Sequence, residues 1–228
     1  MIGGTGVVGR AVRARLEAEG ARVMYTTRAE PAAPGLRLDL REPAAIGEVV
    51  DAAARGLGGL DAMVYCAAVA ETPRPPEASG DRLGAVDPAG WDAVMAVNAR
   101  GAFFACQRAV EHLRRAGGGE LVLIGSVDAV KPVPTPIHHA ASKAALDATG
   151  RALAQAVGAD NIRVNVLHPG LLEGGLSRAL DPELRADFVK HSALRRAGRP
   201  EEVAAVVAWF VGHNTYVTGQ SILVDGGL

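Results

Sequence analysis

The chain opens with the stretch Ile2-Gly3-Gly4-Thr5-Gly6-Val7-Val8-Gly9-Arg10, in which Gly3, Gly6 and Gly9 lie three residues apart. Glycines at this spacing let a backbone turn approach a pyrophosphate, and a following helix offers N–H donors and the positive end of its dipole. A tight turn that binds no ligand can have the same composition. The stretch therefore predicts a turn into a helix and leaves open whether a nucleotide binds there.

Outward from this turn, short apolar segments alternate with segments of helical periodicity. Buried strands are predicted at 22–26, 35–38, 61–67, 120–124, 161–167 and 221–224, and helices at 9–19, 43–57, 88–115, 140–157 and 200–211. Continuous apolar runs are typical of parallel strands covered on both faces. The alternation predicts an α/β fold, a Rossmann-type doubly wound parallel sheet in three layers, as a single domain over 1–228.

Two irregular stretches interrupt this pattern. Residues 70–88 concentrate proline, glycine and charge and are predicted to form a surface loop. Residues 171–192 follow a strand, contain a short helix candidate at 182–190, and are predicted to close over a ligand, since loops after strand ends bind ligands in such sheets.

Composition limits the possible partners. The 228 residues carry 24 basic and 25 acidic side chains, a formal charge of −1, so no basic field exists to bind nucleic acid or anionic lipid. No apolar run is long enough to cross a membrane. Two cysteines without clustered spacing favour a reducing, cytoplasmic location and no metal site.

Further motifs follow the glycine-rich turn in a fixed order. They are Asp61-Ala62-Met63-Val64, Val97-Asn98-Ala99-Arg100-Gly101, Leu123-Ile124-Gly125-Ser126, Ala141-Ser142-Lys143-Ala144-Ala145, Asn165-Val166-Leu167-His168-Pro169-Gly170, and Val217-Thr218-Gly219-Gln220 with Val224-Asp225-Gly226-Gly227. In this order they resemble the short-chain dehydrogenase/reductase family over essentially the whole chain. The resemblance implies a nicotinamide cofactor and a catalytic group of Asn, Ser, Tyr and Lys.

Three members of that group match here, as Asn98, Ser126 and Lys143, and the fourth does not. Four residues before Lys143 the family has Tyr, and this chain has His139. Spacing of four places His139 and Lys143 on one helix face, and an imidazole can exchange a proton near neutral pH. His139 is therefore predicted to replace the tyrosine, with loss of redox chemistry as the alternative.

The resemblance also implies which residues contact the cofactor. Thr27 stands where an acidic residue would bind the ribose of NAD, and the adjacent Arg28 could pair with a 2′-phosphate, so NADP is predicted over NAD. A solvated Arg28 is the alternative, as is a helix N-cap for Asp39. The predicted cofactor-binding residues are Gly3, Thr5, Gly6, Val7, Arg28, Asp39, Leu40, Cys66, Ala67, Lys143, Pro169 and Gly170.

Other positions depart from the family pattern. Tyr65-Cys66-Ala67-Ala68 stands for Asn-Asn-Ala-Gly, and Gly174 stands near where a threonine hydroxyl is common. Only Met1 and Ile2 precede the glycine-rich turn, where the family has about half a dozen apolar residues of a central strand, so the first strand is expected to be truncated. A translation start upstream is the more physical explanation, because unpaired central strands would bury unsatisfied backbone groups.

Together these features predict an NADP(H)-dependent oxidoreductase that interconverts a carbonyl and an alcohol on a small organic substrate. Its homodimer or homotetramer would pack helices 88–115 and 140–157 across a two-fold axis. The alternatives are a non-redox enzyme of this fold, such as a cyclase, dehydratase or aldol-type catalyst that uses His139 as acid and base, and a non-catalytic relative.

Overall fold

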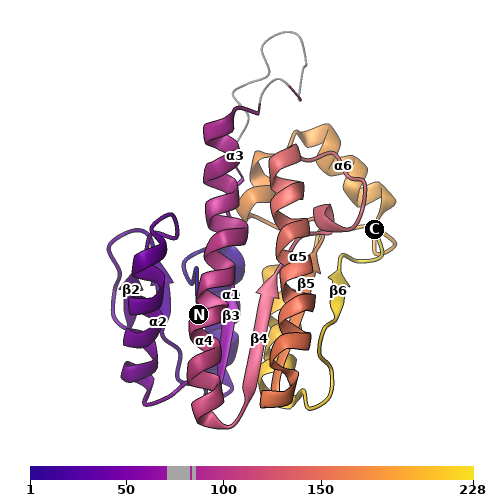
Figure 1. The fold of residues 1–228 in the computed structure, drawn as a ribbon. Helices are drawn as coiled ribbons and strands as arrows, with labels where there is room; N and C mark the ends of the chain where they lie inside the picture. Colours follow the sequence, from indigo (N-terminus) through magenta and orange to yellow (C-terminus); the bar gives the residue numbers. More distant parts are fainter. Residues whose placement is uncertain (71–82, 84–85) are drawn as a thin grey trace.

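Parallel strands form the centre of the molecule, with helices on both sides (Figure 1). The structure is a computed structural model that describes residues 1–70, 83 and 86–228, so most of the loop predicted at 70–88 lies outside the described residues. The strands are β1 (Tyr25–Thr27), β2 (Gly35–Arg37), β3 (Ala62–Tyr65), β4 (Gly119–Ile124), β5 (Ile162–Pro169) and β6 (Ser221–Val224). The helices are α1 (Val7–Ala18), α2 (Pro43–Leu57), α3 (Pro88–Met95), α4 (Gly101–Ala116), α5 (Ile137–Val157), α6 (Pro182–His191) and α7 (Pro200–His213).

The sheet has two parts, joined by the start of the chain. Strands β3, β4, β5 and β6 form one parallel set in that order, and β1 pairs with β2 in parallel. Between β1 and β3 lies the short segment Met1–Ile2. The Ile2 amide donates to Val64 at 2.9 Å and its carbonyl accepts from Cys66 at 2.8 Å, while Thr26 donates to Met1 at 2.9 Å. The first strand is short, as expected, and it still bonds to both neighbours.

Two apolar clusters show that the sheet is covered on both faces. Alternate strand residues such as Met63 and Leu121 pack with α2, α4 and α5 on one face. Their neighbours Val64 and Val122 pack with α1 and α7 on the other. The predicted three-layer α/β fold is confirmed.

The prediction of one uninterrupted α-helix at 88–115 is wrong. A π-helical turn, Ala96–Arg100, separates α3 from α4 inside one continuous rod (Figure 1). A π turn inserts one residue per turn and marks positions with special roles. The apolar spacing gave no sign of it. Asn98 lies in this turn.

Within the described part of the chain, no helix is long and apolar enough to cross a membrane. Among the same residues, no group of three or more His, Cys, Asp and Glu side chains is placed to hold a metal ion.

Candidate active site

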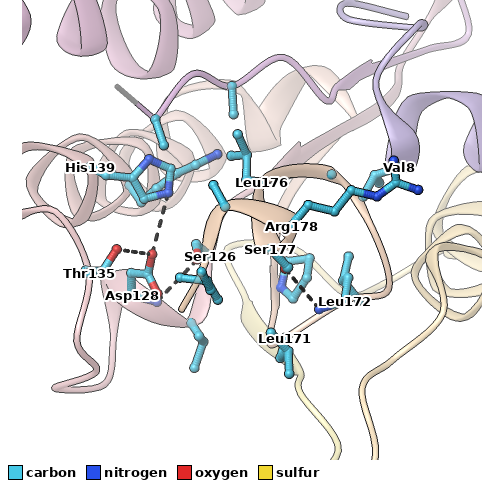
Figure 2. A pocket seen from close by; sticks show the side chains of 18 of the residues that line it. Val8, Ser126, Asp128, Thr135, His139, Leu171, Leu172, Leu176, Ser177 and Arg178 are labelled. Carbon is cyan, nitrogen blue, oxygen red and sulfur yellow. Dashed lines mark hydrogen bonds and ion pairs between the residues drawn. The ribbon is translucent and has the colours of Figure 1, made fainter. Parts of the chain in front are cut away.

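A cavity of about 1000 Å³ opens at the carboxyl ends of the strands. Its wall combines the glycine-rich turn, the ends of β3, β4 and β5, the start of α5, and the segment that includes α6 (Figure 2). Nine predicted site residues line it: Thr5, Gly6, Val7, Cys66, Ser126, His139, Lys143, Pro169 and Gly170. The sequence motifs, far apart in the chain, therefore meet around one space.

The glycine-rich turn leaves room where phosphate would have to approach. Gly3 has φ +81°, and a Cβ on Gly9 would stand 2.2 Å from the Gly3 carbonyl oxygen, so side chains are excluded at both positions. Gly6 caps α1 without a side-chain bond, which leaves the first N–H groups of the helix without competition from a side-chain oxygen. This arrangement fits the pyrophosphate of a dinucleotide.

Ser126 lies just beyond β4, and a buried histidine holds its backbone. His168 Nδ1 donates to the Ser126 carbonyl at 2.8 Å, and Nε2 lies 2.9 Å from Asp147 Oδ1 on α5. The fit is close, because a Cβ on Gly125 would stand 2.5 Å from His168 Nδ1. His168 itself lies at the end of β5.

His139 lies in the first turns of α5 between two oxygen atoms (Figure 2). Its Nδ1 is 3.2 Å from the Val69 carbonyl, and its Nε2 is 3.5 Å from Asp128 Oδ2. The same Asp128 oxygen accepts a hydrogen bond from Thr135 at 2.9 Å. Burial, and then the Lys143 ammonium, lower the pKa of His139, while Asp128 acts in the opposite direction.

Lys143 is almost completely buried at the end of the cavity. It donates to the Ile124 carbonyl at 2.8 Å, and burial lowers its pKa to about 8. Burial also raises the pKa of the neighbouring Cys66 thiol to about 12, so Cys66 is un-ionised at neutral pH.

Asn98 is buried behind the cavity and is not part of its wall. Its side chain accepts from the Val69 amide and donates to the Val69 carbonyl, both at 2.8 Å, and donates to Ser142 Oγ at 3.0 Å. Asn98 thus fixes the carbonyl that His139 contacts.

The remaining predicted cofactor residues lie outside the cavity wall: Gly3, Arg28, Asp39, Leu40 and Ala67. Arg28 is exposed next to Thr27, whose hydroxyl lies 3.2 Å from that of Thr5. Asp39 bonds to Arg41, which lowers the pKa of the carboxyl to about 2. The alternative role of Asp39 as a helix N-cap is wrong, because α2 begins at Pro43 and Glu42 occupies its N-cap position.

Seven polar residues of the cavity wall were not among the predicted site residues: Arg10, Asp128, Thr135, His138, Ser177, Arg178 and Asp181. Asp128 follows Ser126 by two positions, a spacing that could have drawn attention to it. Neither ring nitrogen of the buried His138 has a hydrogen-bond partner among the described residues. Arg178, just before α6, lines the same cavity (Figure 2), a position that no local sequence pattern signals.

The fold and the site define an α/β protein with a large cavity at the carboxyl edge of its parallel sheet. A family model described as Enoyl-(Acyl carrier protein) reductase matches residues 5–228. The 3beta-hydroxysteroid dehydrogenase 1 of Eggerthella lenta is 33% identical over 220 residues, 94% of this chain and 81% of that protein.

Solved structures with a similar fold support the same family. A short-chain type dehydrogenase/reductase from Mycobacterium ulcerans has a TM-score of 0.90 at 28% identity, covering 99% of this chain and 87% of that one. A blue fluorescent protein from a metagenomic library, solved in complex with NADPH, has a TM-score of 0.84 at 29% identity, covering 99% and 95%. The chain belongs to the short-chain dehydrogenase/reductase family, as its motifs indicated.

Proposed function

We propose that this protein is an NADP(H)-dependent oxidoreductase that interconverts a carbonyl and an alcohol on a small organic substrate. The observation that carries the proposal is the single cavity that joins the glycine-rich turn and the N-terminus of α1 to Ser126, His139 and Lys143. Oxidoreductase names among the relatives, and NADPH in one neighbour, support the same class.

The cofactor would lie along this cavity. Thr5, Gly6 and Val7 would hold its pyrophosphate, Lys143 its nicotinamide ribose, and Pro169 and Gly170 the nicotinamide end. When bound, the nicotinamide supplies or accepts the hydride. Arg28, exposed beside Thr27, would pair with a 2′-phosphate, and the ion-paired Asp39 offers no free carboxylate to repel it.

The side chains around the substrate divide the remaining work. Ser126 binds the reacting oxygen of the substrate, and His139 exchanges a proton with it. Lys143 adds positive charge next to both, and Asn98 keeps the Val69 carbonyl in place against His139. Leu176, Leu180, Leu184 and Phe188, in and before α6, form an apolar wall that suits an apolar small-molecule substrate.

Calorimetric titration with NADPH and NADH tests the proposal. We expect NADPH to bind at micromolar strength, about −8 kcal/mol, and more tightly than NADH. Arg28→Ala should weaken NADPH binding selectively, while Arg55→Ala on the surface of α2 serves as the control. An equal loss for both cofactors would remove the assigned role of Arg28.

A non-redox acid–base enzyme is the second candidate, and the imidazole–carboxylate contact of His139 with Asp128 favours it. Binding of neither cofactor in the titration would support this candidate. We further propose a cytoplasmic location, which suits the two free cysteines, and self-association through α3, α4 and α5.

A further inference from the structure

His139 is held from two sides. Its Nδ1 lies 3.2 Å from the Val69 carbonyl oxygen, and its Nε2 faces Asp128 Oδ2 at 3.5 Å (Figure 2). Both side chains are nearly buried, with 5% exposure for His139 and 13% for Asp128. The imidazole ring is therefore fixed between a neutral acceptor, the Val69 carbonyl, and a charged one, the Asp128 carboxylate.

This geometry determines where the ring holds its protons. A carbonyl oxygen only accepts, so Nδ1 carries a hydrogen. A neutral ring would then direct the lone pair of Nε2 at a carboxylate oxygen, which repels it. The contact is favourable only when a proton lies between Nε2 and Oδ2.

The surrounding charges explain why a carboxylate is needed there. From α5 itself, Lys143 and His138 face the ring, and both disfavour an imidazolium, as burial does. From the turn Val127–Ala129, Asp128 is the opposing negative charge, and the Thr135 hydroxyl fixes its Oδ2 at 2.9 Å. Without Asp128, a protonated His139 would stand beside Lys143 with no counter-charge among the described residues.

We propose that Asp128 is a positioning residue for proton transfer: it holds the ring of His139 and stabilises a proton on Nε2, and a substrate oxygen bound by Ser126 takes the place of Asp128 as the partner of that N–H. The inference rests on the proposed function. During reduction, alongside hydride transfer to carbon, the new O–H bond takes this proton and the N–H electron pair stays on Nε2. Water then returns a proton to the pair, whereas in oxidation the alcohol proton moves to Nε2.

The first test needs no cofactor. In protein with labelled histidine, NMR follows the titration of His139, whose signal is assigned by its loss in His139→Gln. Asp128→Asn should lower the titration midpoint by about one pH unit or more, because an opposite charge at this distance is removed. Asp181→Asn, on the same cavity wall at the cap of α6, should leave it unchanged. An unchanged midpoint in Asp128→Asn overturns the proposal.

The second test separates positioning from folding by a double-mutant cycle. Asp128→Asn should lower kcat about 100-fold with little change in KM, and should shift the pH profile. A phenol needs no carboxylate partner, so the same change in a His139→Tyr background should have little effect. Equal losses in both backgrounds would mean a structural role and overturn the proposal.

The outcomes also distinguish this proposal from the function on which it rests. If the unaltered protein binds no nicotinamide cofactor, the proposed function fails, while the NMR titration still decides whether the pair shares a proton. Should Asp128→Asn not fold, nitrogen shifts of the unaltered protein decide: a ring neutral at Nε2 from pH 5 to 9 overturns the proposal.

Discussion

Lys143 lines the candidate active site, and its burial lowers the stability of the folded state. The residue is 2% exposed, and the one hydrogen bond of its ammonium among the described residues goes to a backbone carbonyl, not to a carboxylate. Burial therefore lowers its pKa to about 8. A buried charge without a close partner destabilises the folded state until a ligand uses it.

Lys143→Met is accordingly expected to raise the free energy of unfolding of the cofactor-free protein at pH 7 by about 1–3 kcal/mol, measured by urea denaturation. From about pH 8 to the unfolded value of 10.5, the unfolded chain binds more protons, so the unaltered protein gains stability with pH and the difference shrinks. The exposed Lys190→Met on α6 is the control. A less stable Lys143→Met at pH 7 would contradict the prediction.

Glu120 connects secondary-structure elements through one buried carboxylate. It lies on β4 and accepts hydrogen bonds from Arg163 and Asn165 on β5, at 2.9 and 3.1 Å. Asn214, just after α7, donates to both of its oxygens. Two strands and the turn leading to β6 therefore depend on the same group.

Glu120→Gln replaces one acceptor oxygen with an NH₂ group that faces these donors. We expect the unfolding free energy to fall by about 1–3 kcal/mol, since buried polar groups lose their partners. Glu48→Gln, exposed on α2, should change it by less than about 0.5 kcal/mol. Thermal unfolding followed by circular dichroism measures both, and equal midpoints would show that the network contributes little.

At the level of elements, the sequence predicted the type of every strand and most helices, and failed where long-range contacts matter. The π turn that contains Asn98 is closely packed: a Cβ on Gly101 would meet the Tyr65 hydroxyl at 3.1 Å. Asp128 likewise faces His139 only because the turn Val127–Ala129 and helix α5 pack against each other. Apolar periodicity indicates which face of an element is buried. It carries no information about which polar side chains from distant elements come into contact.

At the scale of the whole molecule, α4 leaves two aromatic rings at the surface. Phe103 and Phe104 are 39% and 37% exposed and pack edge to face with centroids 5.3 Å apart. They lie on one of the helices predicted to join subunits. Exposed aromatic clusters are common at protein interfaces.

Phe103→Glu with Phe104→Glu is expected to reduce self-association, because two charges would have to be buried at the interface. Sedimentation velocity over a range of concentrations measures the change. Trp209 is 45% exposed and lies on α7, a helix that covers the opposite face of the sheet. Trp209→Glu is therefore the matched control. A chain that is monomeric at every concentration, or a larger effect of Trp209→Glu, would contradict this assignment.

The contact between Gly125 and His168 has a consequence for how this sequence can vary. The histidine is tied to both Ser126 and Asp147, so it cannot move aside for a side chain at position 125. The two positions are thus free to change only together, with a smaller residue at 168 making room for a larger one at 125. A library that varies them one at a time would reach few of the combinations that fold.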